Sequence, residues 1–110
     1  MIINARRDTD ATIFDVTGDV DMSNSPELRK ALLDEIRKAK VSKVILNLTG
    51  VKYIDSSGVA SLVEGLKASR DMNSRFVLFG LSASAREVLQ LSRLLKVFEV
   101  RDNEEQALAS

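Results

Sequence analysis

The sequence predicts a mixed-sheet α/β domain: a mostly parallel β-sheet with an antiparallel strand pair at its N-terminal end, and about four α-helices. Apolar runs of strand length at residues 43–48, 75–79 and 97–100 are separated by two helical patterns. This order of strands and helices is typical of right-handed parallel crossovers. Two shorter apolar segments near the N-terminus, on either side of a polar turn, add the antiparallel pair.

Length and composition predict one domain spanning residues 1–110. The 110 residues are 45% apolar and 29% charged, an ordinary globular composition, and the chain has no linker-like or low-complexity segment. A chain of this size buries roughly two-thirds of the surface that its unfolded form exposes, which is enough for a core.

Two missing residue types exclude much enzyme chemistry. The chain has no cysteine and no histidine, which rules out disulfides, Cys/His zinc sites and nucleophiles paired with histidine. Its formal net charge is zero, so no strong field favours nucleic acid or anionic lipid. No apolar run is long enough to span a membrane. We expect a cytoplasmic protein without a cofactor, without direct nucleic-acid contacts and without membrane insertion.

The first elements are an antiparallel strand pair and a helix. Apolar residues within 2–5 and 11–16 flank the turn-forming segment 8–10. Ser25 is expected to cap a helix that has Pro26 at its first position and runs to about Lys40. The residues expected on its apolar face are Leu28, Ala31, Leu32, Ile36 and Ala39.

The remaining elements alternate between strand and helix. The nearly continuous apolar run at 43–48 predicts a central strand covered on both faces. A helix follows, with Val59, Leu62, Val63 and Leu66 on one stripe. After the strand at 75–79, a third helix begins near Ser82 or at Ser84, where Ser84 and Glu87 have capping-box spacing, and turns Val88 and Leu89 inward. A strand at 97–100 and a closing helix at about 103–109 complete the chain.

A candidate functional segment lies between the central strand and the second helix. At such strand-to-helix turns α/β folds place ligands, and this turn contains Asp55, Ser56, Ser57 and Gly58. The first three offer oxygen acceptors to the free amides of the helix, and Gly58 lets a backbone or a partner approach closely. Taken alone, the four residues fit an ordinary helix cap with a spare serine.

The wider pattern of motifs is more specific. In order and spacing the sequence resembles the STAS domain family, in particular the bacterial anti-sigma factor antagonists, and the resemblance covers essentially the whole chain. The segments that carry it are Thr-Gly-Asp-Val-Asp at 17–21, Val-Ile-Leu-Asn-Leu at 44–48, Asp-Ser-Ser-Gly at 55–58, Phe-Val-Leu-Phe-Gly at 76–80 and Leu-Leu-Lys-Val-Phe at 94–98.

The resemblance implies a phosphorylation-switched binding protein and not an enzyme. Ser56 matches the serine that an anti-sigma factor, itself an ATP-dependent serine kinase, phosphorylates in that family. The unphosphorylated form would bind the anti-sigma factor and free the sigma factor, and a serine phosphatase of the PP2C type would reset the switch. Asp21 matches an acidic position close to that serine, and Asp19 stands where glutamate is common. The implied partner-binding residues are Asp19, Asp21, Asp55, Ser56, Ser57 and Gly58.

Elementary electrostatics is compatible with such a switch. A phosphoryl group adds about −1.5 to −2 charges, and at a helix N-terminus it is favoured by about 0.3 to 1 kcal/mol. The fold should therefore tolerate it, whereas a partner surface packed against a neutral hydroxyl should not.

Other functions remain open at this point. STAS domains also occur as subunits of membrane transporters, including lipid-transport ABC systems, and the chain could be a scaffold subunit of a stress-sensing assembly. A magnesium site formed by Asp19, Asp21 and Asp55 is disfavoured because their spacing alone does not bring them together. The same argument disfavours a catalytic carboxylate pair. Met22 is either a core residue or an apolar residue that faces a partner.

Overall fold

The computed structural model describes residues 1–110 and contains a five-stranded sheet with four helices, which confirms the predicted fold class. The strands are β1 (Ile2–Asp8), β2 (Ala11–Thr17), β3 (Lys43–Gly50), β4 (Arg75–Phe79) and β5 (Glu99–Arg101), and they lie in this order across the sheet. The helices are α1 (Ser25–Ala39), α2 (Ser56–Asp71), α3 (Ala83–Leu91) and α4 (Glu104–Ala109). β1 pairs with β2 in the antiparallel sense, and all other neighbouring strands are parallel.

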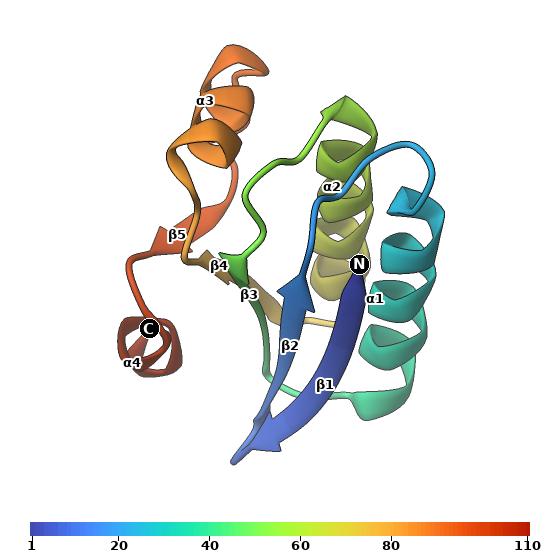
Figure 1. Ribbon diagram of the computed structural model, residues 1–110. Coiled ribbons are helices and arrows are strands. Elements are labelled where there is room, and N and C mark those ends of the chain that lie inside the picture. The colour runs from blue at the N-terminus through green and yellow to red at the C-terminus, as the bar shows by residue number, and fades with distance from the viewer.

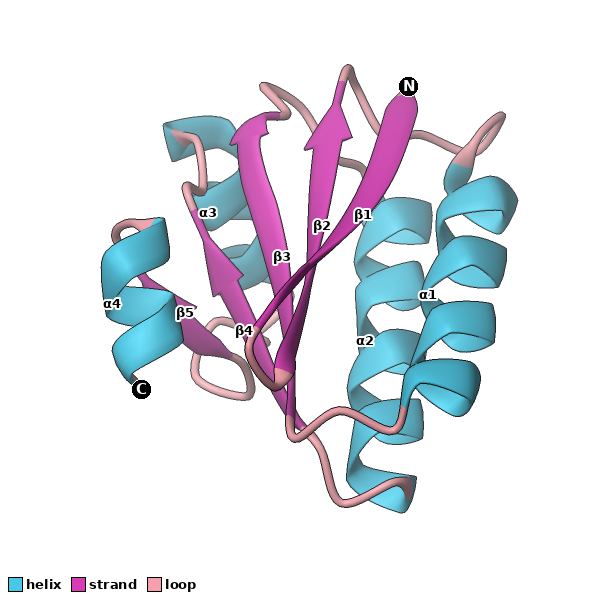
Figure 2. Ribbon diagram, turned by 90° about the horizontal axis from the view of Figure 1, so that it is seen from below, coloured by secondary structure: helices cyan, strands magenta, loops and turns pink.

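The helices cover the sheet unequally. α1 and α2 lie side by side on one face, and the short α4 lies against the other face over β3, β4 and β5 (Figures 1 and 2). The larger core fills the first face and includes Leu32 of α1, Leu62 of α2 and Leu89 of α3. A smaller core beneath α4 contains Ile45, Val77 and other apolar side chains of the central strands. The central strand β3 is thus covered on both faces, as its apolar run predicts.

The strand pair at the N-terminus and the closing helix also follow the predictions. β1 and β2 are joined by Thr9 and Asp10, and Thr9 adopts a left-handed conformation with φ of 53°. α4 begins after Asn103, whose side chain accepts a hydrogen bond from the Gln106 amide at 2.9 Å. No helix has both the length and the apolar character needed to cross a membrane.

The predicted cap of α1 is wrong by one residue. Asn24 is the N-cap, and Ser25 is the first helical residue and is buried. The Asn24 side chain does not cap the helix, because it bonds back into the preceding loop, to the Asp21 amide and the Asp19 carbonyl, both at 2.9 Å. The backbone carbonyl of Asp21 accepts from the Ser25 amide instead, at 2.8 Å.

The structure decides between the two predicted starts of α3. α3 begins after Ser82, which accepts from the Ala85 amide at 3.0 Å, so the alternative start at Ser84 and its capping box are wrong. Leu89 is buried as expected, and Val88 is half-buried.

The last strand starts two residues later than the predicted 97. Val97 is still in a turn, where its amide donates to the Leu94 carbonyl at 3.0 Å. Phe98 turns its ring into the core, 6.3 Å from the ring of Phe76, before the chain joins the sheet at Glu99. Of the two apolar residues before β5, Phe98 is buried and Val97 is 43% exposed, so the start of the apolar run is not the start of the strand.

Candidate functional site

The candidate site is formed by two loops at the carboxyl ends of neighbouring parallel strands. One loop follows β2 and the other follows β3, and an isolated parallel bridge joins them at Val20 and Ile54. The Val20 amide donates to the Tyr53 carbonyl at 3.0 Å, and the Asp55 amide donates to the Val20 carbonyl at 3.1 Å. Because of these bonds, the segment that contains Asp19 and Asp21 lies beside the start of α2, although more than 30 residues separate them in sequence.

Asp55 caps helix α2. Its backbone is extended, and its Oδ1 atom accepts from the Gly58 amide at 3.0 Å and from the Ser57 hydroxyl at 2.5 Å. The Ser57 hydroxyl is the main reason that the pKa of Asp55 lies below its usual range, and the Gly58 amide is the next. Asp55 is therefore a fixed carboxylate at the helix N-terminus.

The two serines after Asp55 have different surroundings. Ser56 is the first residue of α2, its side chain is exposed, and its hydroxyl takes part in no side-chain hydrogen bond. Ser57 is half-buried, and its hydroxyl donates to Asp55. It also lines a cleft of about 310 Å³ between α1 and α2, together with Pro26 and Arg29. Only Ser56 presents an unengaged hydroxyl at this helix start.

The two acidic residues of the β2–α1 loop also differ in whether their side chains are hydrogen-bonded. Asp21 is half-buried, and its Oδ1 atom accepts from the Ser23 amide at 2.9 Å and the Ser23 hydroxyl at 2.5 Å. These bonds lower the pKa of Asp21, whereas the nearby negative charge of Asp55 acts in the opposite direction. The Asp19 side chain is exposed, and only its backbone carbonyl is engaged, by Asn24.

Gly58 has a different role from the one expected. It is buried, and a Cβ atom built on it would lie 2.5 Å from Ile54 Cγ1 and 2.8 Å from Val20 Cγ1. The close approach at Gly58 is therefore made by two core side chains of the same chain, and not by a backbone or a partner. Gly58 lets α2 begin directly against the bridge between the two loops.

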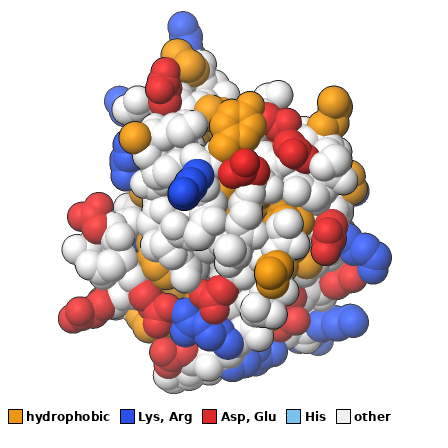
Figure 3. Space-filling model, viewed as in Figure 1, with side chains coloured by type: hydrophobic (Ala, Val, Ile, Leu, Met, Phe, Trp, Pro, Cys, Tyr) orange, Lys and Arg blue, Asp and Glu red, His pale blue; other side chains and the backbone are white.

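Two exposed apolar side chains flank this site. Met22 is 77% exposed, which excludes a core role, and Tyr53 is 47% exposed. Figure 3 shows apolar side chains next to acidic ones on the upper part of the molecule, where the loops of the site lie. Tyr53 and Asn24 are not among the predicted site residues; the available signals were a single tyrosine three residues after β3 and an asparagine directly before α1.

The geometry does not offer a metal site. Asp21 and Asp55 are close enough to interact electrostatically, but no group of three acidic side chains is arranged to hold an ion. The carboxylates use their Oδ1 atoms for local hydrogen bonds instead.

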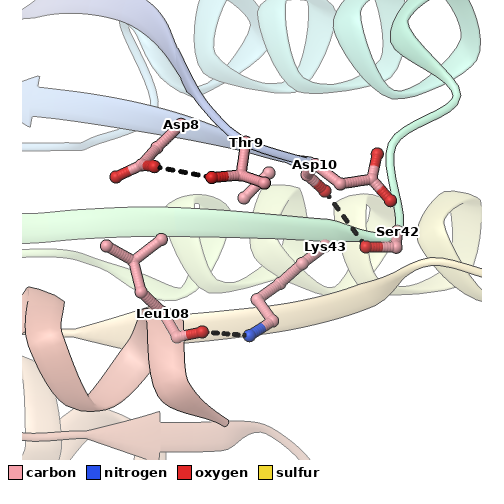
Figure 4. A pocket seen from close by; sticks show the side chains of 7 residues that line it. Asp8, Thr9, Asp10, Ser42, Lys43 and Leu108 are labelled. Atoms are coloured by element: carbon pink, nitrogen blue, oxygen red, sulfur yellow. Dashed lines mark hydrogen bonds between the residues drawn. The ribbon is translucent and has the colours of Figure 1, made fainter.

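A separate pocket of about 320 Å³ lies at the opposite end of the sheet, where β2 and β3 begin (Figure 4). Its polar groups bond one another. Lys43 donates to the carbonyls of Ala107, Leu108 and Ser110, at 3.1, 2.8 and 2.7 Å, and the Ser42 hydroxyl donates to the Asp10 carbonyl at 3.0 Å. The three hydrogen bonds of Lys43 attach α4 to the sheet, and they leave this lysine no free donor for a ligand.

The family model of the STAS domain matches residues 3–107, so the chain belongs to the STAS domain family, and the five-stranded mixed sheet agrees with this. The chain is similar to the anti-sigma-B factor antagonist of Listeria monocytogenes, with 33% identity over 99 residues that cover 89% of this chain and 85% of the relative.

Solved structures share the fold. An anti-sigma factor antagonist from Mycobacterium paratuberculosis superimposes with a TM-score of 0.88 at 18% identity, covering 98% of this chain and 91% of that one. The Bacillus cell fate determinant SpoIIAA in its phosphorylated form gives a TM-score of 0.74 at 22% identity, covering 98% and 97%.

Proposed function

We propose that the protein is an anti-sigma factor antagonist whose binding is switched by phosphorylation of Ser56. The unphosphorylated form binds an anti-sigma factor that is also an ATP-dependent serine kinase, and the sigma factor is released. Phosphorylation of Ser56 ends this binding, and a serine phosphatase of the PP2C type restores it. The observation that carries the proposal is the exposed, unbonded hydroxyl of Ser56 next to a Ser57 hydroxyl that Asp55 holds.

The binding surface in this proposal surrounds Ser56. Its polar part consists of Asp19, Asp21, Asp55 and Ser57. Gly58 is buried beneath this surface and allows α2 to pack closely against the two loops. Met22 and Tyr53 add exposed apolar area, which a partner would bury. The protein is then a phosphoryl acceptor and a binding module in the cytoplasm, without a catalytic site, a cofactor or direct nucleic-acid contacts of its own.

The magnitudes favour an effect on the interface over an effect on the fold. A phosphate at the start of α2 meets a positive helix end, worth about 0.3 to 1 kcal/mol in the favourable direction. Disrupting a desolvated contact of a partner costs about 2 kcal/mol or more. At about 1.4 kcal/mol per factor of ten, that lowers the affinity more than tenfold.

The first experiment identifies the partner. The Ser56→Ala form serves as bait in an extract of the source bacterium, and the retained protein is identified and purified. An anti-sigma factor with kinase activity supports the proposal. A permease or ATPase of a transporter would instead favour a transporter subunit, and a high-mass complex of STAS proteins would favour a scaffold.

The second experiment tests the switch with the purified kinase and ATP. One phosphate is expected on Ser56, and none on Ser56→Ala. Ser56→Asp should weaken binding at least about tenfold with thermal unfolding nearly unchanged. The matched control is Ser84→Asp, which adds the same charge at an exposed serine in the first turn of α3 and should leave binding intact. Phosphate on Ser57 alone, phosphate on neither serine, or equal binding by Ser56→Asp contradicts the proposal.

A further inference from the structure

The start of α2 presents two adjacent hydroxyls, and only one of them is free. Ser57 Oγ donates to Asp55 Oδ1 at 2.5 Å, the same oxygen that accepts from the Gly58 amide at 3.0 Å. Ser57 is half-buried and lines the cleft beside Pro26. Ser56, one residue earlier, is exposed and makes no comparable bond.

Phosphoryl transfer requires a serine hydroxyl that can reorient. The Oγ atom forms a bond to the γ-phosphorus of ATP, the bond from that phosphorus to the β–γ bridging oxygen breaks, and ADP leaves. The hydroxyl proton passes to a base of the kinase. For Ser57 this sequence first requires the loss of a hydrogen bond to an ionised carboxylate, which is among the stronger hydrogen bonds in proteins.

We propose that Asp55 is a positioning residue that directs phosphorylation to Ser56 by holding the hydroxyl of Ser57. The proposal rests on the proposed function and adds what determines the choice between the two serines. Asp55 Oδ1 thus has two roles. It caps α2 by accepting from the Gly58 amide, and it makes Ser57 a poorer phosphoryl acceptor by binding its hydroxyl.

The opposite role for Asp55, as a general base that activates Ser57, fits the site poorly. An efficient base has a pKa near the working pH, whereas the hydrogen bonds from Ser57 and Gly58 hold the pKa of Asp55 below its usual range. The half-buried position of Ser57 beside α1 also restricts the approach of a kinase. If Asp55 activated Ser57 as a general base, Ser57 would be the main phosphoryl acceptor in the wild-type protein.

The test compares phosphorylation of Ser57 with and without the Asp55 carboxylate. The full chain is incubated with its kinase and ATP, and each phosphoserine is assigned by peptide fragmentation in a mass spectrometer. In a Ser56→Ala background, Asp55→Asn is expected to make phosphorylation of Ser57 detectable, at a rate at least about tenfold above the detection limit that applies when Asp55 is present, since a charged acceptor is replaced by a neutral one. Asparagine can still cap the helix, so α2 should remain intact.

The matched control is Asp8→Asn, because the Asp8 carboxylate also accepts from a neighbouring hydroxyl, that of Thr9 at 3.2 Å, but lies at the opposite end of the sheet from Ser57. It should leave the rate at Ser57 unchanged. Circular dichroism and thermal unfolding check each variant. If Asp55→Asn does not fold, Asp55→Thr provides another capping oxygen without a charge, and its own phosphorylation would be seen separately.

The outcomes separate this proposal from the proposed function. If the unmodified protein is phosphorylated at Ser56 and the removal of the Asp55 carboxylate leaves the rate at Ser57 unchanged, the role of Asp55 is refuted and the switch stands. If the wild-type protein is phosphorylated mainly at Ser57, both the role of Asp55 and the assignment of the switch to Ser56 are overturned. If neither serine accepts phosphate, the proposed function itself fails.

Discussion

Gly58→Ala tests whether the seating of α2 against the two site loops depends on the missing side chain. Position 58 lies in the first turn of α2, where its amide donates to Asp55. An alanine Cβ would lie 2.5 Å and 2.9 Å from two carbon atoms of Ile54 and 2.8 Å from one of Val20. Both neighbours are at most 2% exposed, so neither can swing into solvent.

Two opposing effects decide the sign of the change in stability. In an unhindered helix, replacing glycine by alanine stabilises the protein by up to about 1 kcal/mol. Overpacking a well-packed core costs about 1 to 3 kcal/mol, and three contacts below 3.0 Å put this position at the upper end. We therefore expect Gly58→Ala to lower the free energy of unfolding by about 1 to 2 kcal/mol, or the melting temperature by roughly 4 to 8 °C.

Urea denaturation followed by far-ultraviolet circular dichroism measures this quantity. Ala60→Gly is the matched control, because Ala60 is exposed on the same helix and reports the propensity difference without a clash. It should lower stability by about 0.8 to 1 kcal/mol. If Gly58→Ala instead raises stability by a similar amount, helix propensity dominates and the argument that glycine is required by packing is refuted.

Two further predictions concern the α4 attachment and acid stability. Lys43→Met should lower the free energy of unfolding by about 1 to 2 kcal/mol and speed hydrogen exchange of the α4 amides, since three carbonyl contacts are lost. Lys30→Met, which removes only an exposed pair with Asp34, should change stability by less than about 0.5 kcal/mol, and equal losses would contradict the role of Lys43. The pKa values of Asp21 and Asp55 are lowered in the folded state, so their contribution is complete above the unfolded value of about 3.9 and is lost as the pH falls through the folded values. Asp21→Asn with Asp55→Asn should flatten the fall in unfolding free energy below about pH 4 in acid titrations, and an unchanged slope would show that other groups control it.

Periodicity was sufficient to predict the element types because most elements bury one continuous set of side chains. The central strand has apolar residues on both faces, and both faces are covered. Element ends were harder to predict. Ser25 and Asn24 are both good capping residues, and the choice depends on a loop in which Asn24 bonds back to Asp21 and Asp19. That loop is also held by the long-range backbone bonds of Val20 to Tyr53 and Asp55, which the local sequence does not predict.

The site shows the same division between local and long-range information. The cap by Asp55 and the helix start at Ser56 follow from adjacent residues. The meeting of Asp21 with Asp55 does not, because it depends on β2 and β3 being parallel neighbours joined by the bridge from Val20 to Ile54. The packing role of Gly58 depends on the same bridge, since both side chains that exclude a Cβ atom belong to it.

This arrangement also limits how well a carboxylate can imitate the phosphate that we propose on Ser56. The Ser56 side chain makes no hydrogen bond that a modification would break, and the loops beside it are held by bonds of Asp21 and Asp55 that do not involve it. The energy of the switch must then come from charge and bulk presented to the partner. An aspartate adds one charge, and a phosphoserine adds about 1.5 to 2 and three acceptor oxygens. We therefore expect Ser56→Asp to weaken binding less than phosphorylation does, with the difference shrinking as salt screens the exposed charges.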